Sequence, residues 1–450
     1  KNISTTPRSD DKSHYGQLPQ GWAWCKLSSV AKIGTGATPL TSNRTYYDKG
    51  SIPWVTSGAT SADYISTPTA LITQKALDET NCTLYPPGTL LVAMYGEGKT
   101  RGQIAELKIE AATNQACAAI APICNDAFIP AYVKACFNKY YDSLRDQAKG
   151  AQQPNLNLGI ISNFHFPLPP LSEQCRIVAA IESAFTVIDE IEAAKSDLQT
   201  AIATAKQKIL SLAIHGKLVP QDPNDEPAAV LLEHIRAERE QLTKAGKIKR
   251  GKAEKAASAS EDNSYYAGLP ESWAVTSLSA ITTSLTLNDG DWILSENMNP
   301  VGTVKLVQLG SVGYMEYIDK GFKYLSQATF EELNCTVVSP GYMLINRLLG
   351  ERLYACLLPE IDGTLITTVD TCWIAPNENY NLRYLMYMIS SKDFQTQVFL
   401  NSAGSTRKRI SKGNLIQLPF PFPPLAEQHR IVTAIEAAFE QLDSIAATIA

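Results

Sequence analysis

The sequence predicts a two-domain fold class in which two globular domains are separated by long helices that pair as an antiparallel coiled coil, with pseudo-two-fold symmetry between the halves. Three observations predict it. The chain has 450 residues, too many for one ordinary hydrophobic core. The segment that ends the first half of the chain returns at the end of the second half. Both copies of that segment open a heptad pattern of apolar residues.

The internal repeat is the strongest of these signals. Pro167-Leu-Pro-Pro-Leu-Ser-Glu-Gln-Cys-Arg-Ile-Val178 returns as Pro421-Phe-Pro-Pro-Leu-Ala-Glu-Gln-His-Arg-Ile-Val432. Upstream, Leu18-Pro-Gln-Gly-Trp22 matches Leu269-Pro-Glu-Ser-Trp273. The chain is therefore a tandem duplication in which each unit is a globular domain followed by a helix.

The two copies diverge between these anchors. Tyr95–Arg101 faces Leu348–Tyr354, and Gln152–Asn155 faces Thr406–Arg409. A shared scaffold with unlike loops suits two domains that perform one kind of task on different targets.

The segment Ser172–His215 is predicted to be one long helix. Two prolines precede it, Ser172 is a candidate N-cap and Gly216 a candidate C′ residue. About 40 helical residues span roughly 60 Å, and so long an apolar stripe needs a partner. The second copy supplies one, and antiparallel pairing would place the domains at opposite ends. The predicted seam residues are Ile177, Ile181, Ile188, Leu198, Ile202 and Ile209 in the first helix and Ile431, Ile435 and Leu442 in the second.

The predicted organisation has six parts. A further helix is expected over about Glu226–Lys244, packed on the long helix. The second heptad pattern still runs at Ala450, so we expect the natural helix to continue. The parts are a tail (1–17), a first domain (18–171), the long helix and the helix after it (172–245), a basic and serine-rich linker (246–264), a second domain (265–425) and a C-terminal helix (426–450).

Composition excludes several classes of protein. A hydrophobic share of 44% and a charged share of 19% indicate a folded globular chain. No apolar run is long enough to cross a bilayer, and Lys1–Asp11 lacks the apolar core of a signal peptide. The nine cysteines stand singly, without C-x-x-C spacing, which predicts reduced thiols, no zinc site and a cytoplasmic location. A net charge of −5 does not by itself indicate a nucleic-acid binder, although local patches decide that property.

In its motifs the chain resembles the specificity subunits of type I restriction-modification systems. The resemblance covers nearly the whole chain and is carried by the two Leu-Pro-x-x-Trp starts and the two Pro-Leu-x-Glu-Gln-x-Arg-Ile-Val junctions. Gly36-Ala-Thr-Pro39, Ile52-Pro-Trp54 and Gly216-Lys-Leu-Val-Pro-Gln-Asp-Pro223 are also similar to the family's pattern. The second half departs from it, because neither Gly-x-Thr-Pro nor Ile-Pro-Trp occurs near Ser284–Val312. We interpret the second domain as a variant subtype.

The resemblance implies an α+β fold with two target recognition domains of mixed α/β build. It implies a subunit without catalytic residues that binds double-stranded DNA at a bipartite, asymmetric site. It also implies two modification (methyltransferase) subunits that hold S-adenosylmethionine, and restriction motor-nuclease subunits that use ATP and Mg²⁺. A phage inhibitor that mimics DNA is a further partner of such complexes.

Candidate DNA contacts lie in the divergent loops. Arginine can hold guanine O6 and N7 with two hydrogen bonds, glutamine and asparagine suit adenine, and phosphate attraction needs only positive charge. Trp22, Trp54 and Trp273 are interpreted as core residues instead of base-stacking ones. The predicted contacts are Arg44, Tyr46, Lys99, Arg101, Gln152, Gln153 and Asn155 in the first domain and Arg347, Arg352, Arg407, Lys408, Arg409 and Lys412 in the second.

The catalytic motifs that the sequence suggests are incomplete or absent. Gly98-Lys99-Thr100 lacks the glycine that a phosphate-binding loop needs at position 93, which is alanine. No Asn/Asp-Pro-Pro-Tyr/Phe methylation motif occurs, and the five histidines are dispersed. Two alternatives stay open: a specificity subunit of a methylation-only system or of another restriction class, and a coiled-coil scaffold that does not bind DNA.

Overall fold

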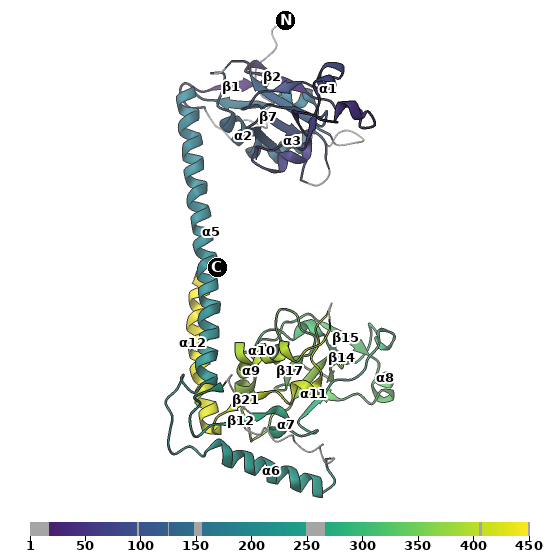
Figure 1. The fold of residues 1–450 in the computed structure, drawn as a ribbon, viewed down its shortest axis with the longest axis vertical. Coiled ribbons are helices and arrows are strands. Elements are labelled where there is room, and N and C mark those ends of the chain that lie inside the picture. The colour runs from purple at the N-terminus through teal and green to yellow at the C-terminus, as the bar shows by residue number, and fades with distance from the viewer. Residues whose placement is uncertain are drawn as a thin grey trace. The chain divides into compact units, whose positions relative to one another are not determined.

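The computed structural model describes residues 18–96, 99–124, 126–147, 155–248, 266–404 and 407–448. The chain divides into two compact units, Lys1–Ile191 and Glu192–Ala450, each with its own sheets and core (Figure 1). The division falls inside helix α5, Leu171–Ile214. Most of the predicted linker, from residue 249 on, lies outside the described residues.

The first unit contains two sheets and a strand pair. The main sheet runs in the order β2-β10-β7-β8-β4 and the second in the order β5-β3-β9-β6, where β3 and β9 are parallel. β7 is apolar throughout and buried at every residue, as expected for a strand covered on both faces. The strands are β1 Ala23–Lys26, β2 Ala31–Thr35, β3 Ile52–Val55, β4 Tyr64–Ile65, β5 Ala70–Ile72, β6 Leu84–Tyr85, β7 Leu90–Ala93, β8 Ile104–Leu107, β9 Ala111–Thr113, β10 Cys117–Pro122 and β11 His165–Leu168. The helices before α5 are α1 Gln74–Glu79, α2 Pro130–Lys139, α3 Tyr141–Gln147 and α4 Leu158–Ser162.

The second unit repeats this topology. Its sheets run β13-β20-β17-β18 and β15-β14-β19-β16, with β14 and β19 parallel, so only β4 has no counterpart among the described residues. The variant sequence of the second domain therefore leaves the strand order intact. The strands are β12 Ala274–Ser277, β13 Leu287–Asp289, β14 Val304–Val307, β15 Phe322–Leu325, β16 Val337–Val338, β17 Met343–Asn346, β18 Tyr354–Leu357, β19 Leu365–Ile366, β20 Thr371–Ile374 and β21 Pro419–Phe422. The helices are α6 Ala228–Lys244, α7 Leu278–Ile281, α8 Gln327–Glu332, α9 Leu382–Ser390, α10 Lys392–Leu400, α11 Lys412–Leu415 and α12 Leu425–Thr448.

Two motifs of the first domain meet in space. The Trp54 Nε1 donates to the carbonyl of Ala37 at 3.0 Å, and Trp54 is buried. A Cβ on Gly36 would lie 1.6 Å from the Thr113 carbonyl oxygen, so no other residue fits there. Gly-Ala-Thr-Pro and Ile-Pro-Trp are thus two sides of one packing contact, which places Trp54 in the core as predicted.

The long helices agree closely with the prediction. α5 covers Leu171–Ile214, and Gly216 follows it in the left-handed region at φ 66°. A Cβ at Gly216 would lie 2.4 Å from the Pro270 Cγ, so the glycine also allows the chain to pack against the start of the second domain. No helix of the described residues is long and apolar enough to span a membrane.

Within the second unit, α5 and α12 lie side by side (Figure 1) and are antiparallel. The Lys206 Nζ lies 2.5 Å from the Asp443 Oδ1 near the end of α12, whereas Gln221, past the end of α5, hydrogen-bonds Glu427 at the start of α12. With the two sheet-rich domains, this pairing confirms the predicted α+β class with an antiparallel helix pair.

The predicted seam residues differ in burial. Ile202, Ile431 and Ile435 are buried, and Leu198, Ile209 and Leu442 are partly buried. In the first unit Ile177 packs on the domain core and Ile181 is partly buried. Ile188 is 47% exposed, and its neighbours Phe185 and Ile191 are both 61% exposed. The middle of α5 therefore presents apolar side chains to the surface of the first unit.

Candidate nucleic-acid interface

A clamp of hydrogen bonds fixes the start of α5 to the first domain. The Trp22 Nε1 donates to the Glu173 Oε2 at 3.0 Å. The Gln174 Oε1 accepts from the Ile129 backbone N–H at 2.9 Å, and its Nε2 donates to the Pro169 carbonyl at 2.9 Å. We call these residues the first junction. They set the direction in which the helix leaves the domain.

The second junction reproduces the clamp at the start of α12. The Trp273 Nε1 donates to the Glu427 Oε2 at 2.9 Å. The Gln428 Oε1 accepts from the Asn381 backbone N–H at 2.9 Å, and its Nε2 donates to the Pro423 carbonyl at 3.0 Å. The repeated tryptophan and the repeated Glu-Gln pair therefore form one hydrogen-bonded contact, which attaches each domain to its helix in the same way. The sequence showed both motifs without showing that they touch.

The second junction has additional contacts from the segment that follows α5. The Gln221 Nε2 donates to the Glu427 Oε1 at 2.6 Å, and the Arg430 guanidinium makes two hydrogen bonds to the Asp225 carboxylate, at 2.6 and 3.2 Å. Burial raises the pKa of the Glu427 carboxyl above its ordinary value, although both hydrogen bonds to it oppose the shift. The segment after α5, which includes the Gly-Lys-Leu-Val-Pro-Gln-Asp-Pro motif, thus covers this junction.

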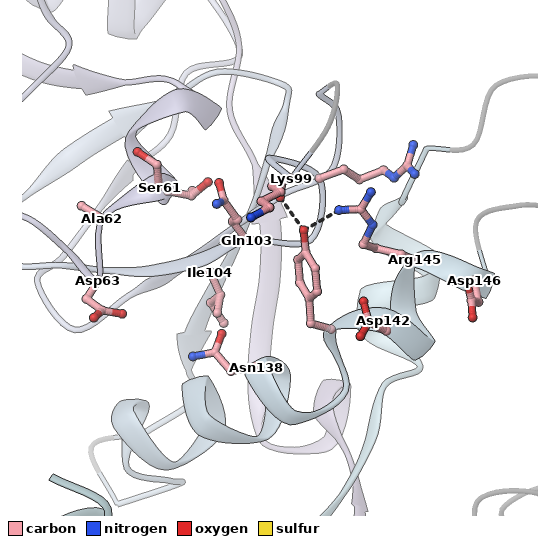
Figure 2. A pocket seen from close by; sticks show the side chains of 13 residues that line it. Ser61, Ala62, Asp63, Lys99, Gln103, Ile104, Asn138, Asp142, Arg145 and Asp146 are labelled. Carbon is pink, nitrogen blue, oxygen red and sulfur yellow. Dashed lines mark hydrogen bonds between the residues drawn. The ribbon is translucent and has the colours of Figure 1, made fainter. Parts of the chain in front are cut away.

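The first domain contains a broad cleft of about 830 Å³ between the loop before β8, the residues before β4 and helices α2 and α3 (Figure 2). Lys99 and Arg101, both predicted from the sequence, line it. The other charged and amide side chains of the cleft were not predicted, because they come from helix surfaces and from loop positions that carry no motif. They are Asp63, Gln103, Asn138, Asp142, Arg145 and Asp146.

Tyr141 organises one wall of the cleft. Its hydroxyl donates to the Lys99 carbonyl at 2.5 Å and accepts from the Arg145 guanidinium, whose centre lies 5.1 Å from the Tyr141 ring. On the loop, the Arg101 Nε and the Gln103 Oε1 are buried and have no hydrogen-bond partner. Buried polar atoms in native proteins are usually hydrogen-bonded, so these two groups leave hydrogen-bonding capacity unused beside the cleft.

The remaining first-domain candidates lie outside the lining of this cleft. Arg44 is exposed in a short 3₁₀ turn. The Tyr46 hydroxyl donates to the Glu79 Oε2 at 3.1 Å, and its ring packs on a small core. Asn155 is partly buried, while Gln152 and Gln153 lie outside the described residues.

Arg347, another of the predicted DNA contacts, is held inside the second domain. Only 4% of it is exposed. Its Nε lies 3.1 Å from the Asp289 Oδ1, and its other nitrogens donate to the carbonyls of Ile410 and Val369. A guanidinium held by a carboxylate and two carbonyls in this way stabilises the domain.

The other second-domain candidates separate into held and exposed side chains. The Arg409 Nη2 lies 2.7 Å from the Asp370 Oδ1, and the Lys412 Nζ donates to the Asn288 Oδ1 at 2.7 Å. Arg352 stacks on the Tyr314 ring at 4.4 Å. Arg407 and Lys408 are exposed, with the Lys408 Nζ 5.5 Å from the Phe399 ring centre. These last two keep their charge at the surface and remain predicted phosphate contacts.

No cluster of three or more His, Cys, Asp or Glu side chains that could hold a metal occurs among the residues with a described placement.

Comparison with known proteins matches both halves of the chain to one family. Residues 19–199 and 270–450 match the family model for the type I restriction modification DNA specificity domain. The EcoAI specificity subunit of Escherichia coli is 28% identical over 57% of this chain and 46% of its own length. The EcoEI specificity subunit of the same species is 30% identical over 51% of this chain and 38% of its own length. The chain thus matches less than half the length of these relatives.

Solved structures share the fold. The HsdS subunit from Thermoanaerobacter tengcongensis aligns with a TM-score of 0.56 and 18% identity, over 97% of this chain and 93% of its own. A chain from a study of complex assembly and conformational transition of the type I R-M system aligns with a TM-score of 0.62 and 17% identity, over 96% of this chain and 94% of its own.

Proposed function

Because the chain belongs to the type I restriction-modification DNA specificity domain family, we propose that it selects the DNA target of a type I restriction-modification complex. Each unit reads one short half-site, and the two half-sites form a bipartite, asymmetric target. The observation that carries this proposal is the duplicated scaffold with unlike surfaces, a mixed cleft in the first unit and an exposed cationic pair in the second. Duplicated domains on paired helices suit two half-sites on one duplex, with a separation set by the spacer.

The chain acts by positioning its partners. We propose that two modification subunits, which bind S-adenosylmethionine, dock on the helices and methylate an adenine in each half-site, with base flipping performed by those subunits. Restriction subunits that use ATP and Mg²⁺ join the same assembly in the cytoplasm. The exposed apolar side chains of Phe185, Ile188 and Ile191 suit such docking. A DNA-mimicking phage inhibitor would occupy the DNA surfaces.

Base-resolution methylation sequencing of a host that carries the complex tests this proposal. The expected result is two short methylated half-sites with a fixed gap. One contiguous site, or no site that depends on this chain, would overturn it.

Salt dependence separates the proposal from a scaffold that does not bind DNA. DNA binding through several lysines and arginines weakens steeply as salt rises, because each neutralised phosphate releases counterions. Binding to random duplex DNA should therefore fall with a logarithmic slope of several units. A complex that forms only with proteins, insensitive to salt, would favour the scaffold.

A further inference from the structure

We propose that the cleft of the first unit reads the base edges of one half-site and that Gln103 and Arg145 are its specificity-determining side chains. The inference rests on the proposed DNA-recognition function. The proposed function assigns DNA recognition to each domain as a whole. The inference assigns base recognition in the first domain to two individual side chains, neither of which was predicted from the sequence.

The chemistry of the cleft favours base edges over phosphate. A phosphate site needs only donors and positive charge, whereas this cleft also contains the carboxylates of Asp142 and Asp146. A carboxylate repels phosphate but accepts a hydrogen bond from the cytosine amino group. Figure 2 shows Asp142, Arg145 and Asp146 on α3, across the cleft from Ser61, Ala62 and Asp63, with Gln103 between them. The cleft therefore offers both donors and acceptors, as the edge of a base pair does in the major groove.

Gln103 lines the cleft and can turn its amide towards a ligand without losing a hydrogen bond at its acceptor. Its Oε1 is buried in the protein alone and has no hydrogen-bond partner there. An adenine edge offers the N6 amino donor to that oxygen and the N7 acceptor to the amide nitrogen. Arg101, which lines the same cleft, likewise has a buried Nε without a hydrogen-bond partner, so this side chain too can turn towards DNA without losing a hydrogen bond at that atom.

Arg145 is oriented by its neighbours before any ligand binds. The Tyr141 hydroxyl accepts from its guanidinium and donates in turn to the Lys99 carbonyl, so the arginine and the loop share one support. Gly102, in the loop before β8, has a φ of 90°, and a Cβ at this position would lie 3.2 Å from the Tyr141 ring. The loop therefore lies close against the tyrosine. A guanidinium held in place loses less entropy when it makes the two hydrogen bonds that guanine accepts.

The test uses the chain assembled with its modification subunits, and methylation of a DNA library randomised in both half-sites. Three variants are compared: Gln103→Ala, Arg145→Lys and the control Lys75→Ala, which removes an exposed cation of the same domain outside the cleft. Each cleft variant should relax discrimination at one or two positions of a single half-site by about 5- to 150-fold. The other half-site and its gap should be unchanged, and the control should resemble the wild type.

Arg145→Lys distinguishes readout from charge. It keeps the positive charge but loses the planar pair of donors, so affinity for random DNA should stay within about twofold while discrimination falls. Full discrimination in both cleft variants would overturn the inference, as would an equal loss at both half-sites, which indicates a structural role. In either case a wild-type complex that still reads two half-sites leaves the proposed function standing. A wild type without a two-part site would contradict the proposed function itself.

Discussion

The two helix junctions share a clamp and differ in what covers it. At the first, Trp22 and Glu173 are partly buried. At the second, Trp273 is 8% exposed and Glu427 is fully buried beneath Gln221. Arg430 is paired with Asp225 there, whereas its equivalent in the first copy, Arg176, is exposed. The same motif is thus a half-open contact in one unit and a buried network in the other.

A repeated motif can thus give the same hydrogen-bond geometry in both units without making the same contribution to the free energy of unfolding. Both clamps orient a helix through tryptophan–glutamate hydrogen bonds of nearly the same length, 3.0 and 2.9 Å. The free energy each contributes depends on its surroundings, because an unpaired donor costs more where water cannot replace the lost partner. Substitutions at equivalent positions should therefore have unequal effects.

The largest inequality is expected for the glutamates. Glu427→Ala leaves the donors of Trp273 and Gln221 without their acceptor and should cost about 3 kcal/mol of local stability. Glu173→Ala, where water reaches the indole, should cost about 1 kcal/mol. Hydrogen exchange followed by mass spectrometry over residues 425–435 and 171–181 measures both opening free energies. Equal costs at the two junctions would contradict the comparison.

The next effect concerns the glycine that lets the covering segment reach the second junction. Gly216→Ala introduces a Cβ 2.4 Å from Pro270 at φ 66°, and we expect a loss of about 2–3 kcal/mol. Gly246→Ala is the matched control, since it has φ 71° and nothing within 4 Å, and should cost about 1 kcal/mol. Urea unfolding of the second unit measures both. If Gly216→Ala lowers the free energy of unfolding no more than Gly246→Ala does, the contact with Pro270 does not restrict the side chain at position 216.

A smaller effect is expected at the arginines. Arg430→Ala breaks the two-hydrogen-bond pair with Asp225, and because that arginine side chain is 36% exposed the loss should be about 1 kcal/mol. Arg176→Ala should leave stability unchanged within about 0.5 kcal/mol. Thermal unfolding of the two variants, compared at 0.15 M and 0.5 M salt, checks this order. The Arg430 effect should shrink at the higher salt concentration, and an effect that grows would argue against an ion pair.

The smallest expected effect is a pH dependence confined to the second junction. Since burial raises the pKa of Glu427 in the folded state, that state binds the proton more tightly than the unfolded chain does. The contribution of this group to stability therefore rises as the pH falls from the raised pKa towards its ordinary value of 4.5. Glu427→Gln should flatten this slope for peptides over residues 425–435. A slope that persists in the variant would assign it to another group.

Much of this architecture could be predicted from sequence because it is periodic or repeated. Both long helices follow from their heptads, and the end of the first follows from Gly216, whereas the N-cap candidate Ser172 lies inside α5, which begins at Leu171. The role of Arg347 could not be predicted, because its partner Asp289 lies on a distant strand and local sequence gives no sign that β13 and the loop after β17 meet. Gln103 and Arg145 were missed for the same reason. Their cleft exists only once α3 packs beside the loop before β8.

If two domains read one DNA duplex through a helical spacer, the length of that spacer sets the gap between the half-sites, and deletion of one heptad from α5 should change the gap. Removing Glu192–Leu198, a heptad that spares the exposed Phe185, Ile188 and Ile191, shortens α5 by about 10 Å while nearly keeping its helical phase. Methylation sequencing of the assembled complex should then show both half-sites unchanged and a gap shorter by about three base pairs. The same two half-sites with an unaltered gap would contradict the account.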